Sequence, residues 1–375
     1  MARNSYLSIK PQFVSFILPT FNERGNINFL ISKIIESFKE HKIEIIVVDD
    51  NSNDGTPELV KELAQNDNRI RLILRYGRSG LSSAIKEGLI SSSGNIACVI
   101  DTDGQVKIED LRKAFDNLIN KNLDIVIGSR FLKHSKRTGL SEKRTIGSSI
   151  ANSLCRKSLP KAYRHITDYQ SICMSINLSK SLSYIYKVDV NGFKFFYELL
   201  SISKGNLKVD DIPLDFLPRE DGQSKLDLSI VWEFITQLIH SYSLKLVPKR
   251  AISFALASSI GSLIQILTTQ ILMNLFNLSF ETSIYISVYF AATSNYIINN
   301  SLTFRNNRLS GKNLIKGLFK FMLVISLPLF ANIGLATVVY SKLNSNPIVA
   351  QLSGIIVVFV WHYAASSRFV WNTPQ

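Results

Sequence analysis

Three short segments of the sequence place carboxylate or amide side chains directly after apolar runs of strand length. They are residues 19–23 (Pro-Thr-Phe-Asn-Glu), 49–56 (Asp-Asp-Asn-Ser-Asn-Asp-Gly-Thr) and 101–105 (Asp-Thr-Asp-Gly-Gln). Several carboxylates in one place repel each other unless a cation or hydrogen-bond donors offset their charge. Asp103 and Gln105 offer oxygen ligands suited to Mg²⁺ or Mn²⁺, and Mg²⁺ usually completes its shell with water and substrate phosphate. The pattern therefore indicates a metal-assisted reaction of a phosphate-bearing substrate.

Each segment also has a purely structural interpretation. The run 49–55 is typical of an Asx turn that leads into a helix capped at Thr56 before Pro57. Asp-x-Asp also occurs widely in solvated loops. The sequence contains neither GxxxxGK[ST] nor GxGxxG, which excludes the usual glycine-rich phosphate loops. None of the five histidines adjoins an acidic segment, so no histidine base is predicted.

An alternation of strands and helices must position these segments. Apolar runs at 13–18, 43–48, 71–74, 96–100 and 124–128 read as strands, and 27–38, 58–65, 82–90 and 110–119 read as helices. Such alternation predicts a parallel α/β sheet with right-handed crossovers and helices on both faces. Ligands of these sheets bind beyond the carboxyl ends of the strands. We therefore expect Glu23, Asp49, Asp50, Asp101 and Asp103 to meet at one edge.

The composition narrows the class of protein. Of 375 residues, 46% are hydrophobic and 19% charged, which excludes a disordered chain. Three cysteines, none in a CxxC pair, exclude a disulfide scaffold and a cysteine-only zinc site. The net charge of +14 indicates a polyanionic partner, and +9 of it follows residue 240, where the sequence is very apolar. This location favours an anionic lipid or phosphorylated substrate, and no nucleic acid is expected as a partner.

Four stretches without charged residues predict four transmembrane helices: 251–280, 282–304, 321–341 and 343–367. The shortest has 21 residues, enough to cross a hydrocarbon core of about 30 Å. The alternative is that these stretches are buried helices of a soluble protein. Four such stretches in succession disfavour this alternative. Cations concentrate before the first stretch, between the second and third, and after the fourth. The positive-inside rule then places both termini in the cytoplasm.

Residues at the borders of the membrane region predict three further features. Residues 1–10 lack the apolar segment of a signal peptide, so the N-terminal part is expected to stay cytoplasmic. Apolar residues recur at helical spacing in 226–240, which predicts an interfacial helix, with a core helix as the alternative. Residues 295–304 and 362–371 form a weak repeat, unless they are independent aromatic belts. Asn295, Asn299 and Asn300 are expected to face another helix or a headgroup.

The acidic segments, together with Gly-Ser-Arg-Phe at 128–131, occur in the order and spacing of the family 2 glycosyltransferases. The sequence most resembles the polyprenyl-phosphate (dolichol-phosphate) mannose synthases over residues 13–226, including two further motifs at 191–194 and 213–226. The four apolar stretches resemble the GtrA-like membrane domain. The resemblance implies a GT-A type, Rossmann-like catalytic domain with a mostly parallel sheet over 1–226. An interfacial helix and linker (227–250) and a four-helix transmembrane domain (251–375) would follow.

The resemblance also implies roles for individual residues. The nucleotide sugar would be held by Pro19, Phe21, Glu23, Val48, Asp50, Asp101, Thr102, Asp103, Arg130, Arg219 and Lys225. Asp103 and Gln105 would bind Mg²⁺ or Mn²⁺. The acceptor phosphate would meet Arg130, Arg144 and Ser148. Arg144, Ser148 and Asn152 share one face of the predicted helix 142–159, which could instead be a solvated face. The catalytic set is Asp103, Arg130, Arg219 and Lys225.

The implied activity is inverting transfer of a hexose, mannose from GDP-mannose, to a polyprenyl phosphate such as dolichyl or undecaprenyl phosphate. A phosphate monoester has a second pKa of about 6, so the acceptor needs no strong base. Two departures from the family concern recognition: Phe21 stands where a tyrosine is usual, and residues 168–172 read Asp-Tyr-Gln-Ser-Ile instead of Asp-Pro-Met-Ser-Gly.

Three other activities stay open at this point. A UDP-glucose-dependent polyprenyl-phosphate glucosyltransferase would use the same chemistry. A lipid-linked sugar flippase with a regulatory soluble domain would use the membrane region instead. A processive polysaccharide synthase is disfavoured because no Gln-x-x-Arg-Trp segment precedes the apolar stretches.

Overall fold

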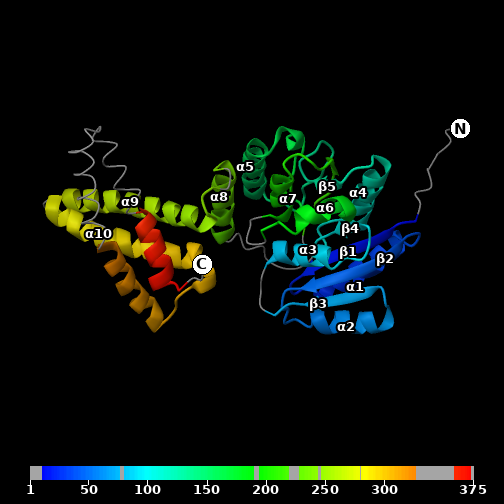
Figure 1. Ribbon diagram of the computed structural model, residues 1–375, viewed down its shortest axis with the longest axis horizontal. Helices are drawn as coiled ribbons and strands as arrows, with labels where there is room; N and C mark the ends of the chain where they lie inside the picture. Colours follow the sequence, from blue (N-terminus) through cyan, green and yellow to red (C-terminus); the bar gives the residue numbers. More distant parts are fainter. Residues whose placement is uncertain are drawn as a thin grey trace. The chain divides into compact units, whose positions relative to one another are not determined.

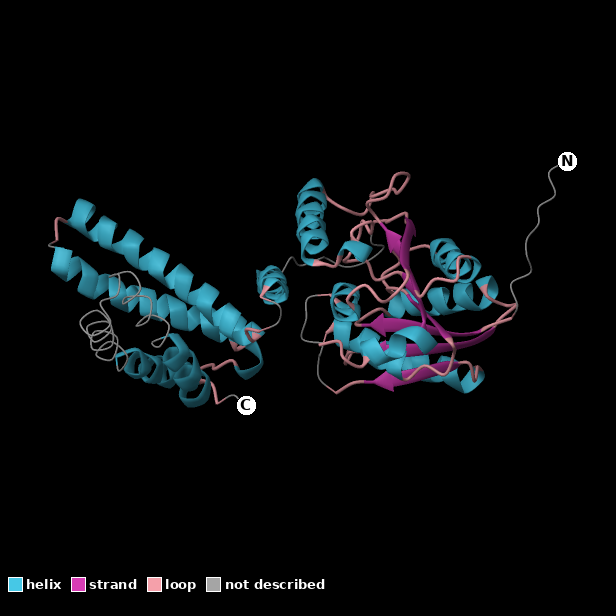
Figure 2. Cartoon of the chain, turned by 45° about the horizontal axis from the view of Figure 1, so that its top comes forward, coloured by secondary structure: helices cyan, strands magenta, loops and turns pink. Residues whose placement is uncertain are grey.

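The computed structural model describes residues 11–76, 80–189, 194–218, 228–243, 246–278, 280–326 and 359–372. The chain divides into two compact units, Met1–Leu226 and Asp227–Gln375, called the first and second unit below (Figure 1). The first unit combines helices with a sheet, whereas the described part of the second unit is helical (Figure 2).

A seven-stranded sheet in the order β3-β2-β1-β4-β6-β5-β7 forms the centre of the first unit. Its strands are β1 (Phe13–Thr20), β2 (Lys42–Asp49), β3 (Ile70–Leu74), β4 (Ile96–Val99), β5 (Ile125–Ser129), β6 (Met174–Asn177) and β7 (Val209–Pro213). The pairs β1–β2, β1–β4, β2–β3 and β5–β7 are parallel, and β6 is antiparallel to β4 and β5. Six strands therefore end at one edge, which confirms the predicted mostly parallel α/β sheet.

Helices cover both faces of this sheet because its strands are apolar on both faces. Phe16 and Leu18 of β1 pack into a core with α1 (Arg24–Ser37), α2 (Thr56–Asn66) and α4 (Ile108–Asn120). On the other face α3 (Leu81–Ile90), α6 (Leu178–Ile185) and α7 (Phe195–Ser203) contact one another. A Cβ atom on Gly88 of α3 would lie 2.5 Å from Ile17 Cγ2, so this close packing requires glycine. The four predicted helices are confirmed, with ends shifted by up to three residues.

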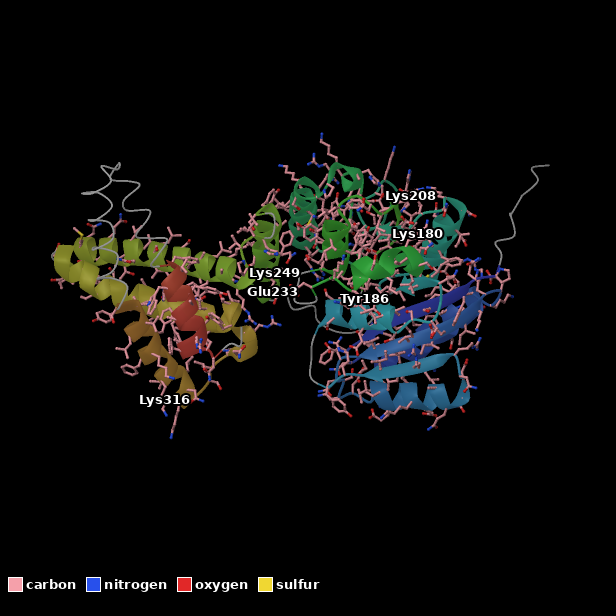
Figure 3. All side chains as sticks on the ribbon, viewed as in Figure 1. Lys180, Tyr186, Lys208, Glu233, Lys249 and Lys316 are labelled. Carbon is pink, nitrogen blue, oxygen red and sulfur yellow. The ribbon has the colours of Figure 1, made fainter. Side chains whose placement is uncertain are left out.

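The second unit contains α8 (Leu228–Tyr242), α9 (Lys249–Phe276) and α10 (Phe280–Ile298), followed by helical residues 312–326 and 359–365. The helices α9 and α10 pack side by side. Lys316 extends outward from its helical segment (Figure 3). Within the described part of the chain, α9 alone has the length and apolar composition needed to cross a membrane. The predicted stretches 321–341 and 343–367 fall largely outside the described residues.

The structure supports the predicted repeat between residues 295–304 and 362–371. Both segments end in a π-helical turn, η2 (Asn299–Thr303) and η4 (Ser366–Val370), and an aromatic residue follows each turn. The two aromatic rings, Phe304 and Trp371, stack with centroids 4.2 Å apart and an interplanar angle of 11°. Corresponding parts of the two segments therefore meet inside the second unit.

The polar side chains of this region face other parts of the unit. Asn299 and Asn300 are buried. The Asn300 side chain donates to the Leu309 carbonyl at 3.0 Å and accepts from Trp371 Nε1 at 3.0 Å. Asn295 Nδ2 donates to Ser258 Oγ of α9 at 3.4 Å. Of the two expected neighbours, a helix and a lipid headgroup, the structure shows the first for Asn295, and it buries Asn299 and Asn300 inside the protein.

Candidate active site

The loops after β1 and β2 are tied together at the carboxyl edge of the sheet. The backbone N–H groups of the first loop donate to side chains of the second: Asn22 to Ser52 Oγ (2.8 Å), Glu23 to Thr56 Oγ1 (3.1 Å) and Arg24 to Asp54 Oδ2 (3.1 Å). Hydrogen bonds from Thr56 and Arg24 outweigh burial and hold the pKa of Asp54 below its ordinary value. The run 49–56 thus builds the turn and also places Glu23 beside it.

The adjacent carboxylates Asp49 and Asp50 have different surroundings. Asp49 is fully buried and accepts hydrogen bonds from Thr20 Oγ1 (3.1 Å), Ser52 N (2.8 Å) and Ser52 Oγ (2.6 Å). Its side chain therefore belongs to the turn. Asp50 accepts from the Gly80 backbone at 2.8 Å and lies 3.3 Å from Arg75 Nη2. Asp50 is the member of the pair that remains at the candidate site.

The acidic loop 101–105 follows β4 and is fixed to both neighbouring segments. Thr102 Oγ1 donates to the Pro19 carbonyl at 3.2 Å, which joins the loop to the end of β1. Gly104 adopts a φ of 73°, a conformation that favours glycine, and the turn lets Gln105 N donate to Asp103 Oδ1 at 3.2 Å. Asp103 and Gln105 are thus held on one turn.

These two residues fit a hard divalent cation. They present a carboxylate and an amide oxygen, and Mg²⁺ typically takes one or two carboxylates and leaves its other positions to water and phosphate. Among the described residues, no three His, Cys, Asp or Glu side chains gather into a metal-ligand group.

The segment 214–217 lies between the acidic loop and the loop after β5. Gln105 Nε2 donates to the Leu217 carbonyl and Leu217 N donates to the Gln105 carbonyl, both at 2.9 Å. On the other side, Gly139 N donates to the Phe216 carbonyl at 2.9 Å, and a Cβ atom on Gly139 would lie 1.9 Å from the Leu217 oxygen. This packing brings the chain to the acidic loop two residues before Arg219. Arg219 and Lys225 themselves lie outside the described residues.

An open groove reaches the acidic loop between α1 and α4. Its volume is about 570 Å³, and its lining includes Thr102, Gly104 and Leu217. The exposed ring of Phe21 lies on the loop after β1. Pro19 and Val48 are buried, and Val48 packs its side chain toward Gly88 of α3, so that side chain belongs to the core.

Arg130 at the end of β5 forms a buried ion pair that the sequence did not reveal. Its Nε and Nη2 donate to Asp168 Oδ2 (2.7 Å) and Oδ1 (3.0 Å). The Arg130 side chain is 13% exposed and Asp168 is fully buried. Burial opposes ionisation, but the Arg130 charge holds the pKa of Asp168 below its ordinary value, and Asp168 likewise raises the pKa of Arg130. The guanidinium is therefore fixed in orientation and stays charged.

Lys194 joins Arg130 and Arg144 in a cluster of cations. Burial is the largest cause that lowers the pKa of Lys194, the positive charges of Arg130 and Arg144 lower it further, and Asp101 and Asp168 oppose them. The motif at 191–194 singled out this lysine without a role, and residues 191–193 lie outside the described residues. We call Arg130, Arg144 and Lys194 the cation cluster.

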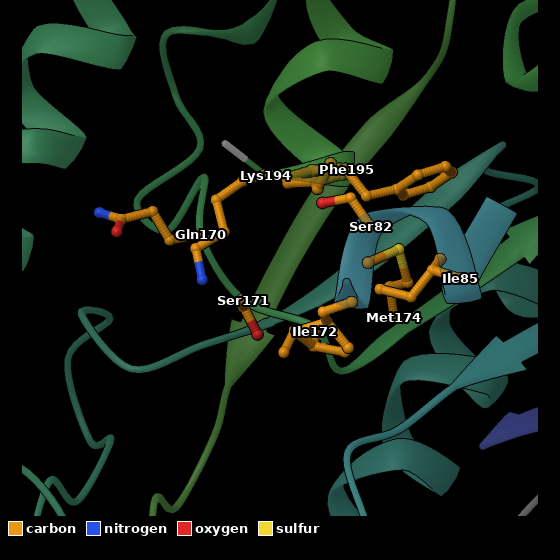
Figure 4. Close-up of a pocket in the computed structure, with 10 residues that line it drawn as sticks. Ser82, Ile85, Gln170, Ser171, Ile172, Met174, Lys194 and Phe195 are labelled. Atoms are coloured by element: carbon orange, nitrogen blue, oxygen red, sulfur yellow. The ribbon is translucent and has the colours of Figure 1, made fainter. Parts of the chain in front are cut away.

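A small cavity lies beside the cation cluster. It has a volume of about 10 Å³, is lined by Lys194, Gln170 and Ser171 among others (Figure 4), and has room for about one water molecule. It is therefore no substrate pocket.

The helix α5 (Glu142–Ser158) presents two different faces. Arg144 and Ser148 are half-buried, and Asn152 is buried, so the face that could have been solvated points into the unit. The opposite face carries Ile146, Ile150 and Leu154 with exposures of 61%, 57% and 36%. We call these three residues the apolar row. Its spacing of four residues produces a continuous stripe along the helix.

Comparison with known proteins gives two family matches. Residues 15–182 match the model for glycosyl transferase family 2, and residues 253–371 match the GtrA/DPMS transmembrane domain.

Three curated relatives are dolichol-phosphate mannosyltransferases. The Pyrococcus furiosus protein is 29% identical, and the match covers 96% of this chain and 99% of the Pyrococcus protein. The Mycosarcoma maydis protein is 30% identical, with 61% of this chain and 78% of its own covered. The Saccharomyces cerevisiae protein is 28% identical, and the match covers 64% of this chain and 91% of the yeast protein.

Among solved structures, similarity extends to glucosyl-3-phosphoglycerate synthase from Mycobacterium tuberculosis, with 18% identity and a TM-score of 0.45 over 61% of this chain and 80% of that chain. Mannosyl-3-phosphoglycerate synthase from Rubrobacter xylanophilus has 16% identity and a TM-score of 0.46. The match covers 60% of this chain and 73% of that chain.

Proposed function

Because the chain belongs to the family 2 glycosyltransferases of the dolichol-phosphate mannosyltransferase type and carries a GtrA/DPMS transmembrane domain, we propose its specific reaction. It transfers mannose from GDP-mannose to a polyprenyl phosphate with inversion at the anomeric carbon. The product is a lipid-linked β-mannosyl phosphate.

The observation that carries this proposal is the neighbourhood of the cation cluster. The turn 168–170 binds Arg130 through Asp168 Oδ2 at 2.7 Å and the backbone of Ser148 on α5 through Gln170 Nε2 at 3.2 Å. The apolar row lies on the outer face of the same helix, opposite Arg144 and Ser148, where it can contact the bilayer that holds the acceptor chain. An acceptor with an anionic head and an apolar chain matches both features. A water-soluble sugar acceptor would have no use for the apolar row.

On the donor side, Asp50 and Glu23 bind the base and ribose, and Pro19, Phe21, Asp101, Thr102 and the backbone of Val48 complete the pocket. The first loop is tied to the second, and Thr102 ties the acidic loop to β1, so this pocket is preorganised. A divalent cation held by Asp103 and Gln105 would supply positive charge to the diphosphate of the donor. Arg219 and Lys225 bind the same diphosphate from the segment that continues after Leu217.

On the acceptor side, Arg130, Arg144 and Ser148 hold the phosphate. Above its second pKa of about 6 the phosphate is a dianion, so its oxygen attacks without a general base. The new bond joins this oxygen to the anomeric carbon, while the bond to the nucleoside diphosphate breaks and the diphosphate keeps the electron pair. The fixed charge of Arg130 offsets the repulsion between two anionic groups, which is electrostatic catalysis by a preorganised site.

The membrane domain follows from the acceptor. A polyprenyl phosphate stays in the bilayer with its phosphate at headgroup level, so tethering raises its effective concentration at the site. We propose that the first unit and both chain termini are cytoplasmic, and that α8 lies at the interface. Val231, Ile235 and Ile239 of α8 are exposed at four-residue spacing, which supports an interfacial position.

The test is a transfer assay with membranes that contain the full-length protein. Polyprenyl phosphate is added with radiolabelled GDP-mannose or, separately, UDP-glucose, and the lipid extract is counted. We expect label from GDP-mannose in the lipid phase. If only UDP-glucose labels the lipid, the transferred sugar is glucose and not mannose. If neither donor labels the lipid, the proposed transfer reaction is refuted.

A further inference from the structure

One short turn connects the two elements that carry the proposed acceptor cations. The turn consists of Asp168, Tyr169 and Gln170. At one end Asp168 binds the Arg130 guanidinium through two hydrogen bonds of 2.7 and 3.0 Å. At the other end Gln170 Nε2 donates to the Ser148 carbonyl of α5 at 3.2 Å. The same turn therefore contacts both Arg130 and the residue proposed to bind the acceptor phosphate with it.

A buried asparagine strengthens this connection. Asn152 Oδ1 accepts from the backbone N–H of Tyr169 at 3.0 Å and from Gln170 Nε2 at 3.4 Å. Gln170 N in turn donates to Asp168 Oδ1 at 3.1 Å, which links the α5 contacts to the carboxylate that binds Arg130. Asn152 is 3% exposed, so these bonds are shielded from water.

The position of α5 depends on its inner face. The apolar row on the outer face is exposed, so it makes few packing contacts within the first unit. Arg144, Ser148 and Asn152 lie four residues apart on the inner face, so fixing Asn152 and Ser148 also fixes the direction from which Arg144 approaches. A shift of about 1 Å between groups that act together can lower an enzymatic rate by about 100-fold.

Gln170 is also where this sequence departs from the family it resembles. Its segment 168–172 reads Asp-Tyr-Gln-Ser-Ile, with glutamine at the position of the methionine in Asp-Pro-Met-Ser-Gly. A methionine side chain has no N–H to donate, so it cannot make the bond to the Ser148 carbonyl. A methionine at position 170 would therefore leave the Ser148 carbonyl without this contact.

We propose that Asn152 and Gln170 are positioning residues that set the spacing between Arg130 and the Arg144–Ser148 pair, so that all three reach one acceptor phosphate. The proposal rests on the proposed function. It predicts that the contacts of Asn152 and Gln170 affect binding of the acceptor. Binding of the nucleotide sugar should stay unchanged, because the donor pocket is built from other loops.

The experiment measures KM for each substrate separately with the full-length protein in membranes or detergent. Gln170→Met removes the amide while keeping the length of the side chain. We expect KM for polyprenyl phosphate to rise about tenfold, because both hydrogen bonds from the Gln170 amide to α5 are lost. We expect KM for the nucleotide sugar to change less than twofold. In an Arg144→Ala background the same substitution should have a much smaller effect, since coupled residues are not additive.

A matched control removes another contact of the same helix. Tyr197→Phe deletes the hydroxyl that lies 2.8 Å from Ser158 Oγ near the end of α5. It should leave both KM values unchanged, and the thermal midpoints of both variants show whether either loses its fold. Equal changes in both KM values, or full additivity with Arg144→Ala, would overturn the positioning role. If the wild type glycosylates no polyprenyl phosphate, the proposed function fails instead, and the assay distinguishes the two failures.

Discussion

Asp103 is the side chain on which the proposed donor chemistry depends most directly. Asp103→Ala removes the carboxylate of the metal pair, so we expect transfer to fall by at least about 100-fold, as for other electrostatic catalytic groups. The initial rate at saturating Mn²⁺ or Mg²⁺ measures the effect. Asp116→Ala is the control, because Asp116 is a carboxylate on α4 that pairs with Arg112 at 3.0 Å. Near-normal activity of Asp103→Ala would remove the metal assignment.

The buried pair of Asp168 and Arg130 makes a prediction about stability. Asp168→Asn leaves the Arg130 guanidinium with little solvent and no countercharge, which typically costs about 3–5 kcal/mol. We expect a lower free energy of unfolding and a lower kcat, with the Asp103→Ala variant as a comparison that loses activity alone. Urea unfolding of the purified protein, followed by far-UV circular dichroism, measures the change. A variant as stable as the wild type would show that the pair contributes no net stability.

The same pair also predicts how stability depends on pH. The folded-state pKa of Asp168 is lowered, so the folded protein holds fewer protons than the unfolded chain as the carboxylate titrates. Its stabilisation is complete above the unfolded pKa of about 3.9 and is lost as the pH falls through the folded value. Unfolding free energies measured from pH 6 to pH 3 should therefore fall less steeply for Asp168→Asn than for the wild type. Parallel curves would contradict this assignment.

The residues of the site differ in how far the sequence could predict them. Asp103 and Gln105 belong to one contiguous segment, so their common turn follows from the sequence. Asp168 lies 38 residues from Arg130, and only the folding of two separate segments against each other brings them together. Lys194 belonged to a recognised motif, but its proximity to Arg130 and Arg144 depends equally on tertiary structure. Asp49 and Asp50 are adjacent in sequence, and only their hydrogen-bond partners separate turn from site.

At the level of elements, apolar continuity decided which strands the sequence could predict. Each of the first five strands contains an apolar run, broken at most by a single polar residue such as Ser15, Glu44 or Arg71, and the structure contains all five. In β6 the polar residues Ser175 and Asn177 alternate with apolar ones, and β7 contains Asp210 and Asp211. Lys121 pairs with Asp210 at 2.9 Å, and Thr167 donates to Asp211 at 2.6 Å, so both acids are satisfied by distant partners. No local sequence pattern predicts partners that lie so far away in the chain.

The helix α5 carries the prediction that belongs to this scale. Ile150→Glu places a charge in the middle of the apolar row, where the proposal puts the lipid. Because Ile150 is 57% exposed, the fold should be unaffected, whereas KM for membrane-embedded polyprenyl phosphate should rise about tenfold or more. Tyr186→Glu is the control, since Tyr186 is also 57% exposed, at the end of α6 and outside the proposed acceptor surface. Similar KM values for Ile150→Glu and the wild type would leave the apolar row without a role in acceptor binding.

At the scale of the whole molecule, charge and hydropathy separate two tasks. The acidic segments lie in the first unit, and +9 of the net charge of +14 follows residue 240. Half of the ten Lys and Arg residues in this part of the sequence lie in residues 305–320, after α10. Basic segments next to a membrane are attracted to anionic headgroups on the cytoplasmic side. The charge pattern therefore agrees with the proposal that the second unit anchors the protein in a membrane with anionic headgroups.

The cysteines of the protein allow this topology to be tested cleanly. Cys98, Cys155 and Cys173 are buried, and burial raises the pKa of Cys98 to about 12 and the pKa of the other two above the ordinary range. Because the thiolate is the reactive form, they should not react with a membrane-impermeant thiol reagent. Cysteines introduced at Leu278, after α9, and at Asn313, after α10, then report on opposite sides. In intact cells we expect Leu278→Cys to be labelled and Asn313→Cys to be protected, and in inverted vesicles the reverse, since cations flank only the second position. Labelling of Asn313→Cys from outside the cell would mean that the basic segment is not cytoplasmic, and the proposed placement of the acceptor phosphate at the inner leaflet would fail with it.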